Sequence, residues 1–92
     1  MKKLIWTPKF LKSAENIITR HPELSESFKQ RIRMLEDNPF NPALRTHKLK
    51  GPLSGYYACS LNYNYRIVFE IEKRESDELI ILIQIGTHDE VY

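Results

Sequence analysis

Apolar residues in the first half of the chain recur at helical spacing, which predicts two helices. Thr7-Pro8 is typical of a helix start, with threonine as the N-cap and proline at the first helical position. His21-Pro22 interrupts this first helix, and Asn38-Pro39 ends the second. The two apolar stripes consist of Phe10, Leu11, Ala14, Ile17 and Ile18, and of Leu24, Phe28, Ile32 and Leu35. We therefore expect an antiparallel helix pair laid on a sheet.

The remaining pattern is typical of short strands separated by turns. A short strand is expected at residues 3–6 and an edge strand at 47–50. Longer strands are predicted at 56–61, 65–73 and 79–85, the last apolar enough to be buried on both faces. Strands joined by short turns pair antiparallel. The predicted fold class is α+β, a single domain over residues 1–92, with an N-terminal strand and a two-helix hairpin packed on a twisted, mainly antiparallel sheet.

Alternation along the strand at 65–73 separates two faces of this sheet. Its apolar set is Tyr65, Ile67, Phe69 and Ile71. If that set packs beneath the helices, Arg66 points from an open face, which Tyr56, Ala58 and Ser60 of the preceding strand share. We expect the loops that carry His47 and His88 to converge on this open face.

Composition excludes several classes of protein. The single cysteine, Cys59, allows no intrachain disulfide, which suits a reducing cytosol, and its apolar surroundings predict a core residue. The histidines lack the spacing of a metal site, and no glycine-rich phosphate loop is present, so no cofactor is expected. No signal peptide or membrane span is recognised. These observations favour a cytoplasmic protein.

The charged residues are distributed unevenly along the chain. The formal net charge is only +2, but residues 38–69 contain no Asp or Glu. The same segment contains Arg45, Lys48, Lys50 and Arg66. This asymmetry predicts one basic face, which is a plausible footprint for phosphates.

Two histidines and an arginine near one basic face suit the metal-free cleavage of RNA. In that reaction the 2′-hydroxyl attacks the adjacent phosphate, so one group must remove a proton and another must protonate the leaving oxygen. Histidine transfers protons near neutral pH, and arginine offers a planar fork to charged oxygens. His88 follows a predicted strand directly, at a place where rigid scaffolds present reactive groups, and the aromatic Tyr92 ends the chain.

Simpler interpretations of the same residues stay open. A terminal segment such as residues 86–92 is often frayed, and His21 is expected to be an exposed polar residue. Arg66 can pair with Glu70 along one face of its strand. Lys48 and Lys50 can protect an edge strand from aggregation.

Three stretches of the chain resemble the RelE/ParE toxin superfamily, and most closely its RelE, YoeB and YafQ branch. They are the run at residues 47–57, which reads HKLKGPLSGYY, the strand YRIVF at 65–69, and the closing IGTHDEVY at 85–92. The order of strand, helix pair and antiparallel strands is also similar, so the resemblance spans nearly the whole chain.

The resemblance implies a type II toxin, a ribosome-dependent mRNA endonuclease of RelE-like fold that is silenced by a cognate antitoxin. It implies catalytic roles for His47, Arg66, His88 and Tyr92, with the division between base and acid left open. It implies mRNA in the ribosomal A site as substrate, contacts to 16S rRNA, and RNA binding by Arg45, Lys48, Lys50, Tyr56, Ser60 and Asn64. Ser60 and Asn64 stand where YafQ-like toxins carry a further histidine and an aspartate.

Two other functions share this fold. The ParE branch poisons DNA gyrase and does not need a histidine at both position 47 and position 88. A catalytically inactive toxin relic that only binds an antitoxin is the third possibility, against which Arg66, His47 and His88 argue together.

Overall fold

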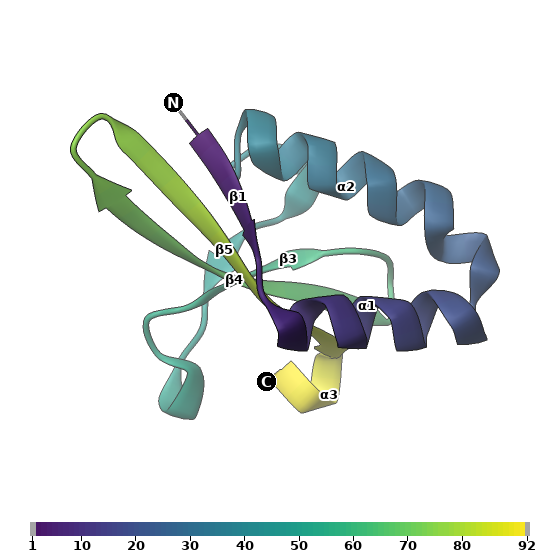
Figure 1. Ribbon diagram of the computed structural model, residues 1–92. Helices are drawn as coiled ribbons and strands as arrows, with labels where there is room; N and C mark the ends of the chain where they lie inside the picture. The colour runs from purple at the N-terminus through teal and green to yellow at the C-terminus, as the bar shows by residue number, and fades with distance from the viewer. Residues whose placement is uncertain (1, 92) are drawn as a thin grey trace.

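Two helices cover one face of a five-stranded sheet in the computed structural model, which describes residues 2–91 (Figure 1). The strands run in the order β1-β5-β4-β3-β2, with β1 parallel to β5 and the other pairs antiparallel. The predicted α+β class is confirmed. The elements are β1 (Lys2–Trp6), α1 (Pro8–Arg20), η1 (Pro22–Leu24), α2 (Ser25–Asp37), η2 (Pro42–Leu44), β2 (His47–Lys48), η3 (Gly51–Leu53), β3 (Tyr57–Ser60), β4 (Tyr65–Arg74), β5 (Asp77–Thr87) and α3 (His88–Val91).

The start of α1 joins the first helix to the central strand. Thr7 is the N-cap, as predicted, and its Oγ1 accepts from the backbone N–H of Phe10 at 3.2 Å. The same hydroxyl donates to the carbonyl of Leu82 at 2.6 Å, and Ser13 Oγ accepts from the N–H of Ile85 at 3.0 Å. Pairing between β1 and β5 ends at Leu82, so α1 satisfies backbone groups of β5 beyond that point.

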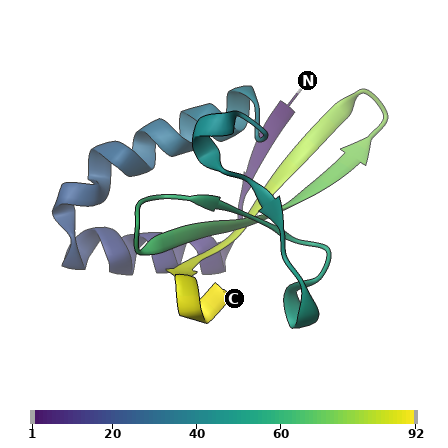
Figure 2. The same cartoon turned by 180° about the vertical axis from the view of Figure 1, so that it is seen from behind.

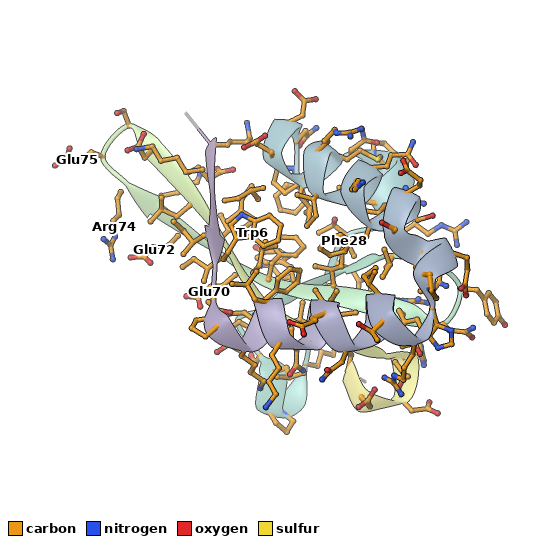
Figure 3. The ribbon with its side chains drawn as sticks, turned by 45° about the vertical axis from the view of Figure 1, so that its right-hand side comes forward. Trp6, Phe28, Glu70, Glu72, Arg74 and Glu75 are labelled. Carbon is orange, nitrogen blue, oxygen red and sulfur yellow. The ribbon has the colours of Figure 1, made fainter. Side chains whose placement is uncertain are left out.

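The main core lies between the helices and the sheet. Phe10, Leu35, Ile67 and Phe69 are completely buried there. Trp6 and Phe28 lie at one side of this core with their ring centroids 6.4 Å apart, and Figure 3 shows both between the sheet and the helices. The alternate residues of β4 therefore face the helices as the sequence pattern predicts.

The opposite face of the sheet is only partly open, so the expectation of an exposed face was wrong over its centre. Ala58 and Val68 are completely buried on that face, beneath Leu49 and Val91. The physical reason is that the segment after β2 and the C-terminal α3 fold back across the strands. Figure 2 shows both segments from behind.

The strand predicted at residues 79–85 is longer and less buried than expected. It spans 77–87, and its register with β4 shifts between Val68 and Phe69 because β5 carries one extra residue. Ile80 and Leu82 are completely buried, whereas Ile81 and Ile83 are partly exposed, with Ile83 packed against the cluster around Val68 and Val91. With β4 it forms a hairpin that projects past the helices, with Glu75 at its tip (Figures 1 and 3).

The last described residues form a short helix, α3, in place of the frayed end that was one interpretation. Thr87 and Glu90 form a capping box: Glu90 Oε1 accepts from the N–H of Thr87 at 2.8 Å, and Thr87 Oγ1 accepts from the N–H of Glu90 at 3.2 Å. Gly86 leaves room for this turn, because a Cβ there would lie 3.3 Å from Cγ2 of Val91. Within residues 2–91, the helices are too short or too polar to cross a membrane.

The capping box predicts that α3 loosens in acid. The hydrogen bonds from Thr87 lower the pKa of the Glu90 carboxyl below its ordinary value. A lowered pKa in the folded state stabilises α3 above the ordinary glutamate pKa, and this stabilisation is lost as the pH falls through the lowered pKa. Amide hydrogen exchange at residues 87–91, followed against pH, should show faster opening in acid. Glu90→Ala should open this segment at neutral pH as well.

Glu90→Gln is the matched control, because its amide oxygen still accepts from Thr87 but does not ionise. Exchange at residues 87–91 in this variant should lose the acid step that Glu90 causes. If the acid step in exchange were unchanged in Glu90→Gln, a group other than Glu90 would cause it.

Candidate functional site

A depression of about 520 Å³ lies at the end of the sheet where β3 turns into β4. Its walls come from five parts of the chain: the segment that leads into the start of β2, the end of β3, the turn that follows β3, the start of β4 and the start of α3. The lining residues are Arg45, His47, Ser60, Asn62, Tyr63, Arg66 and His88. The three side chains expected to converge, His47, Arg66 and His88, thus meet at one hollow. We call it the phosphate pocket, from its basic lining.

Strand register explains why this hollow forms at the end of the covered face. Ser60, Arg66 and Gly86 stand opposite one another across β3, β4 and β5, so their side chains share one face. Gly86 contributes no side chain to the row, and Val91 packs over it. Arg66 and Ser60 therefore line the boundary where the covering segments stop.

The turn between β3 and β4 holds the guanidinium of Arg66. Nη1 donates to the carbonyls of Asn62, Tyr63 and Tyr65 at 2.8, 3.2 and 3.1 Å. All three of these bonds come from one nitrogen, and the residue also lines the pocket. These carbonyls, rather than Glu70, are the partners that orient Arg66.

Asn62 organises the same turn, and the sequence analysis did not select it. Its Oδ1 accepts from the backbone N–H groups of Asn64 and Tyr65 at 3.0 and 2.8 Å. Its carbonyl accepts from Ser60 Oγ at 3.1 Å as well as from Arg66. The signal was present in the sequence, because an asparagine that opens a turn often bonds to the backbone two residues on. Tyr63 was missed as a pocket residue too, and it is 91% exposed.

The loop before β2 orients His47. Nδ1 of its ring lies 3.0 Å from the carbonyl of Arg45. A carbonyl only accepts, so Nδ1 carries a proton and Nε2 of the neutral ring holds the lone pair. Arg45 itself has a φ of 54°, a left-handed conformation that is uncommon for a side-chain-bearing residue.

The first residue of α3, His88, completes the hollow. Its backbone N–H donates to the carbonyl of Asn64 at 3.2 Å, which ties α3 to the β3–β4 turn. Nδ1 of the ring lies 3.7 Å from Oδ1 of Asp89, an ion-pair distance when the ring is protonated. The capping box of Thr87 and Glu90 fixes the start of α3 and therefore the position of His88.

Not every residue selected from the sequence lies at this pocket. Lys48 pairs with Tyr57, whose side chain packs in the main core, so Lys48 faces away from His47. Lys50 is exposed beyond β2, and Tyr56 packs against the cluster around Val68. Tyr92 lies outside the described residues.

Neither Cys59 nor a metal cluster adds further chemistry at the described site. Burial raises the pKa of the Cys59 thiol to about 12, which suits the core residue predicted from the sequence. Within residues 2–91, the histidine, cysteine and acidic side chains do not gather in a group of three that is able to hold a metal ion. The side chains that line the described pocket bear imidazole, guanidinium, hydroxyl and amide groups.

Solved structures of bacterial toxins are similar to this fold. A YoeB/ParE toxin from Agrobacterium tumefaciens is 24% identical, with a TM-score of 0.76 over 94% of this chain and 98% of that one. YafQ from E. coli is 16% identical, with a TM-score of 0.80 over 100% and 99%. The YoeB-YefM complex from Staphylococcus aureus contains a chain that is 16% identical, with a TM-score of 0.71 over 96% and 98%.

A search of curated protein sequences found no match. The model of one protein family, described as the bacterial toxin of type II toxin-antitoxin systems, YafQ, matches residues 2–92. The match covers nearly the whole chain, and the resemblance suggested by the sequence is confirmed. The chain belongs to the YafQ family of bacterial toxins of type II toxin-antitoxin systems.

Proposed function

We propose that this toxin is a ribosome-dependent endoribonuclease, which cleaves mRNA in the ribosomal A site without a metal ion and so inhibits translation in the cytoplasm. The observation that carries the proposal is the phosphate pocket, where His47, Arg66 and His88 line one hollow of about 520 Å³. Two imidazoles and a guanidinium supply a base, an acid and a charge partner for one phosphate.

The ring contacts of the two histidines, a hydrogen bond at His47 and an ion-pair distance at His88, favour one division of roles. His47 donates from Nδ1 to the Arg45 carbonyl, so its Nε2 is the acceptor for the proton of the 2′-hydroxyl. The O2′–P bond forms as the P–O5′ bond breaks, and protonated His88, beside Asp89, gives its proton to O5′. The products are a 2′,3′-cyclic phosphate and a 5′-hydroxyl end.

Arg66 stabilises the charge that develops on the phosphorane oxygens. The turn at Asn62 and Tyr63 holds its guanidinium in place before substrate binds, so little reorganisation is needed during the reaction. Arg45 and Ser60 line the same pocket. We assign Arg45 to the same phosphate group, whereas the Ser60 hydroxyl donates to the Asn62 carbonyl and supports the turn. The proposed role of Tyr92 is to stack on the substrate or on His88.

The other basic and polar residues selected from the sequence bind RNA outside the phosphate pocket in this proposal. Asn64 lies beside the pocket, whereas Lys48, Lys50 and Tyr56 lie farther along the β2 edge. We assign the two lysines to phosphates of mRNA or 16S rRNA, because exposed lysines contribute salt-dependent affinity without reading sequence.

A cognate antitoxin is the protein partner in this proposal. Similar toxins have been solved as the E. coli DinJ-YafQ complex and as the Staphylococcus aureus YoeB-YefM complex. The basic phosphate pocket suits an acidic antitoxin segment that folds on binding and blocks Arg66 or displaces α3.

Removal of the Arg66 guanidinium should abolish toxicity without unfolding the protein. We expect Arg66→Ala to lower the cleavage rate on programmed ribosomes by roughly 10²–10³-fold, the usual effect of losing one donor to a developing oxyanion. Arg74→Ala is the matched control, because Arg74 lies at the far end of the same strand and pairs with Glu72. Primer extension of mRNA after induction measures the effect in cells.

Full toxicity from folded Arg66→Ala protein would contradict the assignment. A DNA-damage response without new 5′ ends in mRNA would favour gyrase as the target. Antitoxin binding without any toxicity of the wild-type chain would indicate an inactive binding module.

Each histidine should be needed for cleavage, and the effects of the two substitutions on the cleavage rate should not be additive in free energy. His47→Gln and His88→Gln should each remove most of the activity, and the double variant should lose little more, because the two residues act as a unit. The wild-type rate should depend on pH with a bell shape, since one ring acts neutral and the other protonated. If His47→Gln kept full activity, the role of His47 would be to contact RNA and not to transfer a proton.

An acidic antitoxin segment should bind across the β2 edge, where Lys48 and Lys50 are exposed, and silence the nuclease. Reversing the charge of Lys48 and Lys50 together should weaken the complex and slow its formation, mostly at low salt. Lys73→Glu, at the tip of the β4–β5 hairpin, is the control. An antitoxin that bound tightly and left cleavage unchanged would contradict this prediction.

A further inference from the structure

A second cavity continues from the phosphate pocket toward η1. It has a volume of about 600 Å³, and Asn62, Tyr63, Arg66 and His88 line both cavities. Such a volume lies within the range of ordinary ligand sites and suffices for one nucleoside. The two hollows therefore adjoin at these shared residues, and we call them together the groove.

The two halves of the groove differ in charge. Among residues 2–91, Arg45, His47 and Arg66 line the phosphate pocket and no side-chain carboxylate does, whereas Glu23 and Asp89 line the second cavity. A carboxylate repels phosphate, but it accepts hydrogen bonds from N–H groups. The first half thus suits the sugar–phosphate backbone, and the second suits the donor edge of a base.

The walls of the second cavity suit a flat ring. Leu24 is buried at its wall and the ring of Tyr65 lies beside it, so part of the surface is apolar. Tyr63 stands at the junction with 91% of its surface exposed, which leaves an aromatic face available to a base.

Glu23 is positioned at the rim through His21. Its Oε2 lies 3.5 Å from Nδ1 of His21, and the His21 ring centroid lies 5.8 Å from that of Tyr65. His21, which was expected to be an exposed polar residue, has a side chain 42% exposed, and it also lies against Tyr65 and lines the second cavity. The Glu23 side chain is 70% exposed, so its carboxylate is reachable from the groove.

We propose that the second cavity binds the nucleobase on the 3′ side of the cut and prefers guanine through Glu23. The proposal rests on the endoribonuclease function above. His88, which protonates the 5′-oxygen of the 3′ nucleotide, lines both cavities, whereas His47 lines only the first. Guanine offers two adjacent donors, N1–H and N2–H, to the two oxygens of one carboxylate. Adenine offers one donor beside an acceptor, which matches an amide instead.

The test compares four mRNAs on programmed ribosomes that differ only in the nucleotide 3′ of the cut. Wild type should cleave the guanine substrate about ten-fold faster than the adenine one, which is typical discrimination for a paired hydrogen bond. Glu23→Gln should remove or invert this preference while its best substrate is still cleaved. Glu26→Gln is the matched control, because Glu26 pairs with Lys29 on the exposed side of α2 and should leave the profile unchanged.

A binding measurement separates this inference from the function on which it rests. Dinucleotides with a 2′-deoxy sugar in the first position are not cleaved, and those ending in guanine should shift the NMR signals of Tyr63 and His21 at lower concentration than those ending in adenine. Cleavage by wild type with equal base preference in Glu23→Gln would overturn the guanine subsite alone. Absence of cleavage by wild type would overturn the nuclease, and guanine-selective shifts lost in Glu23→Gln would still support the subsite.

Discussion

Complete burial of Ile67 and Phe69 beneath α1 and α2 is the constraint on which the rest of the structure depends. Successive side chains of a strand point to opposite faces, so burying these two turns Arg66 and Val68 to the other side. A slip of one residue would bury the guanidinium and expose the apolar set, at a large cost in free energy. The hydrophobic effect therefore positions the group that we assign to the phosphate.

Part of the second face of the sheet is covered by packed side chains, and the rest is open. Leu49 and Val91 cover Ala58 and Val68, and the cover stops at the row that contains Arg66. Gly86 lets Val91 approach the strand, and the capping box of Thr87 and Glu90 fixes the start of α3. The same compact turn brings His88 to the edge of the groove, so packing and chemistry share one short segment.

Rigid turns, rather than long loops, orient the groups in the groove. Asn62 holds the β3–β4 turn through its side chain and anchors Arg66 and Ser60 through its carbonyl. In this chain the hydroxyl of Ser60 supports that turn, at a position where the resemblance to YafQ-like toxins places a proton-carrying histidine. Proton transfer is thereby left to His47 and His88 in the proposed mechanism.

The sequence by itself determined the helix pair, the alternation of β4 and the basic segment around His47, because these depend on spacing of three or four residues, on alternation, or on local charge. It also contained the capping box at Thr87 and the turn-forming Asn62, which were overlooked as local signals. Only the tertiary structure decided that Leu49 and Val91 cover Val68, that Lys48 faces away from His47, and that His21 and Glu23 join the groove. Those relations join residues far apart in the chain, and they depend on how the β2 segment, η1 and α3 pack across the sheet, which no local pattern encodes.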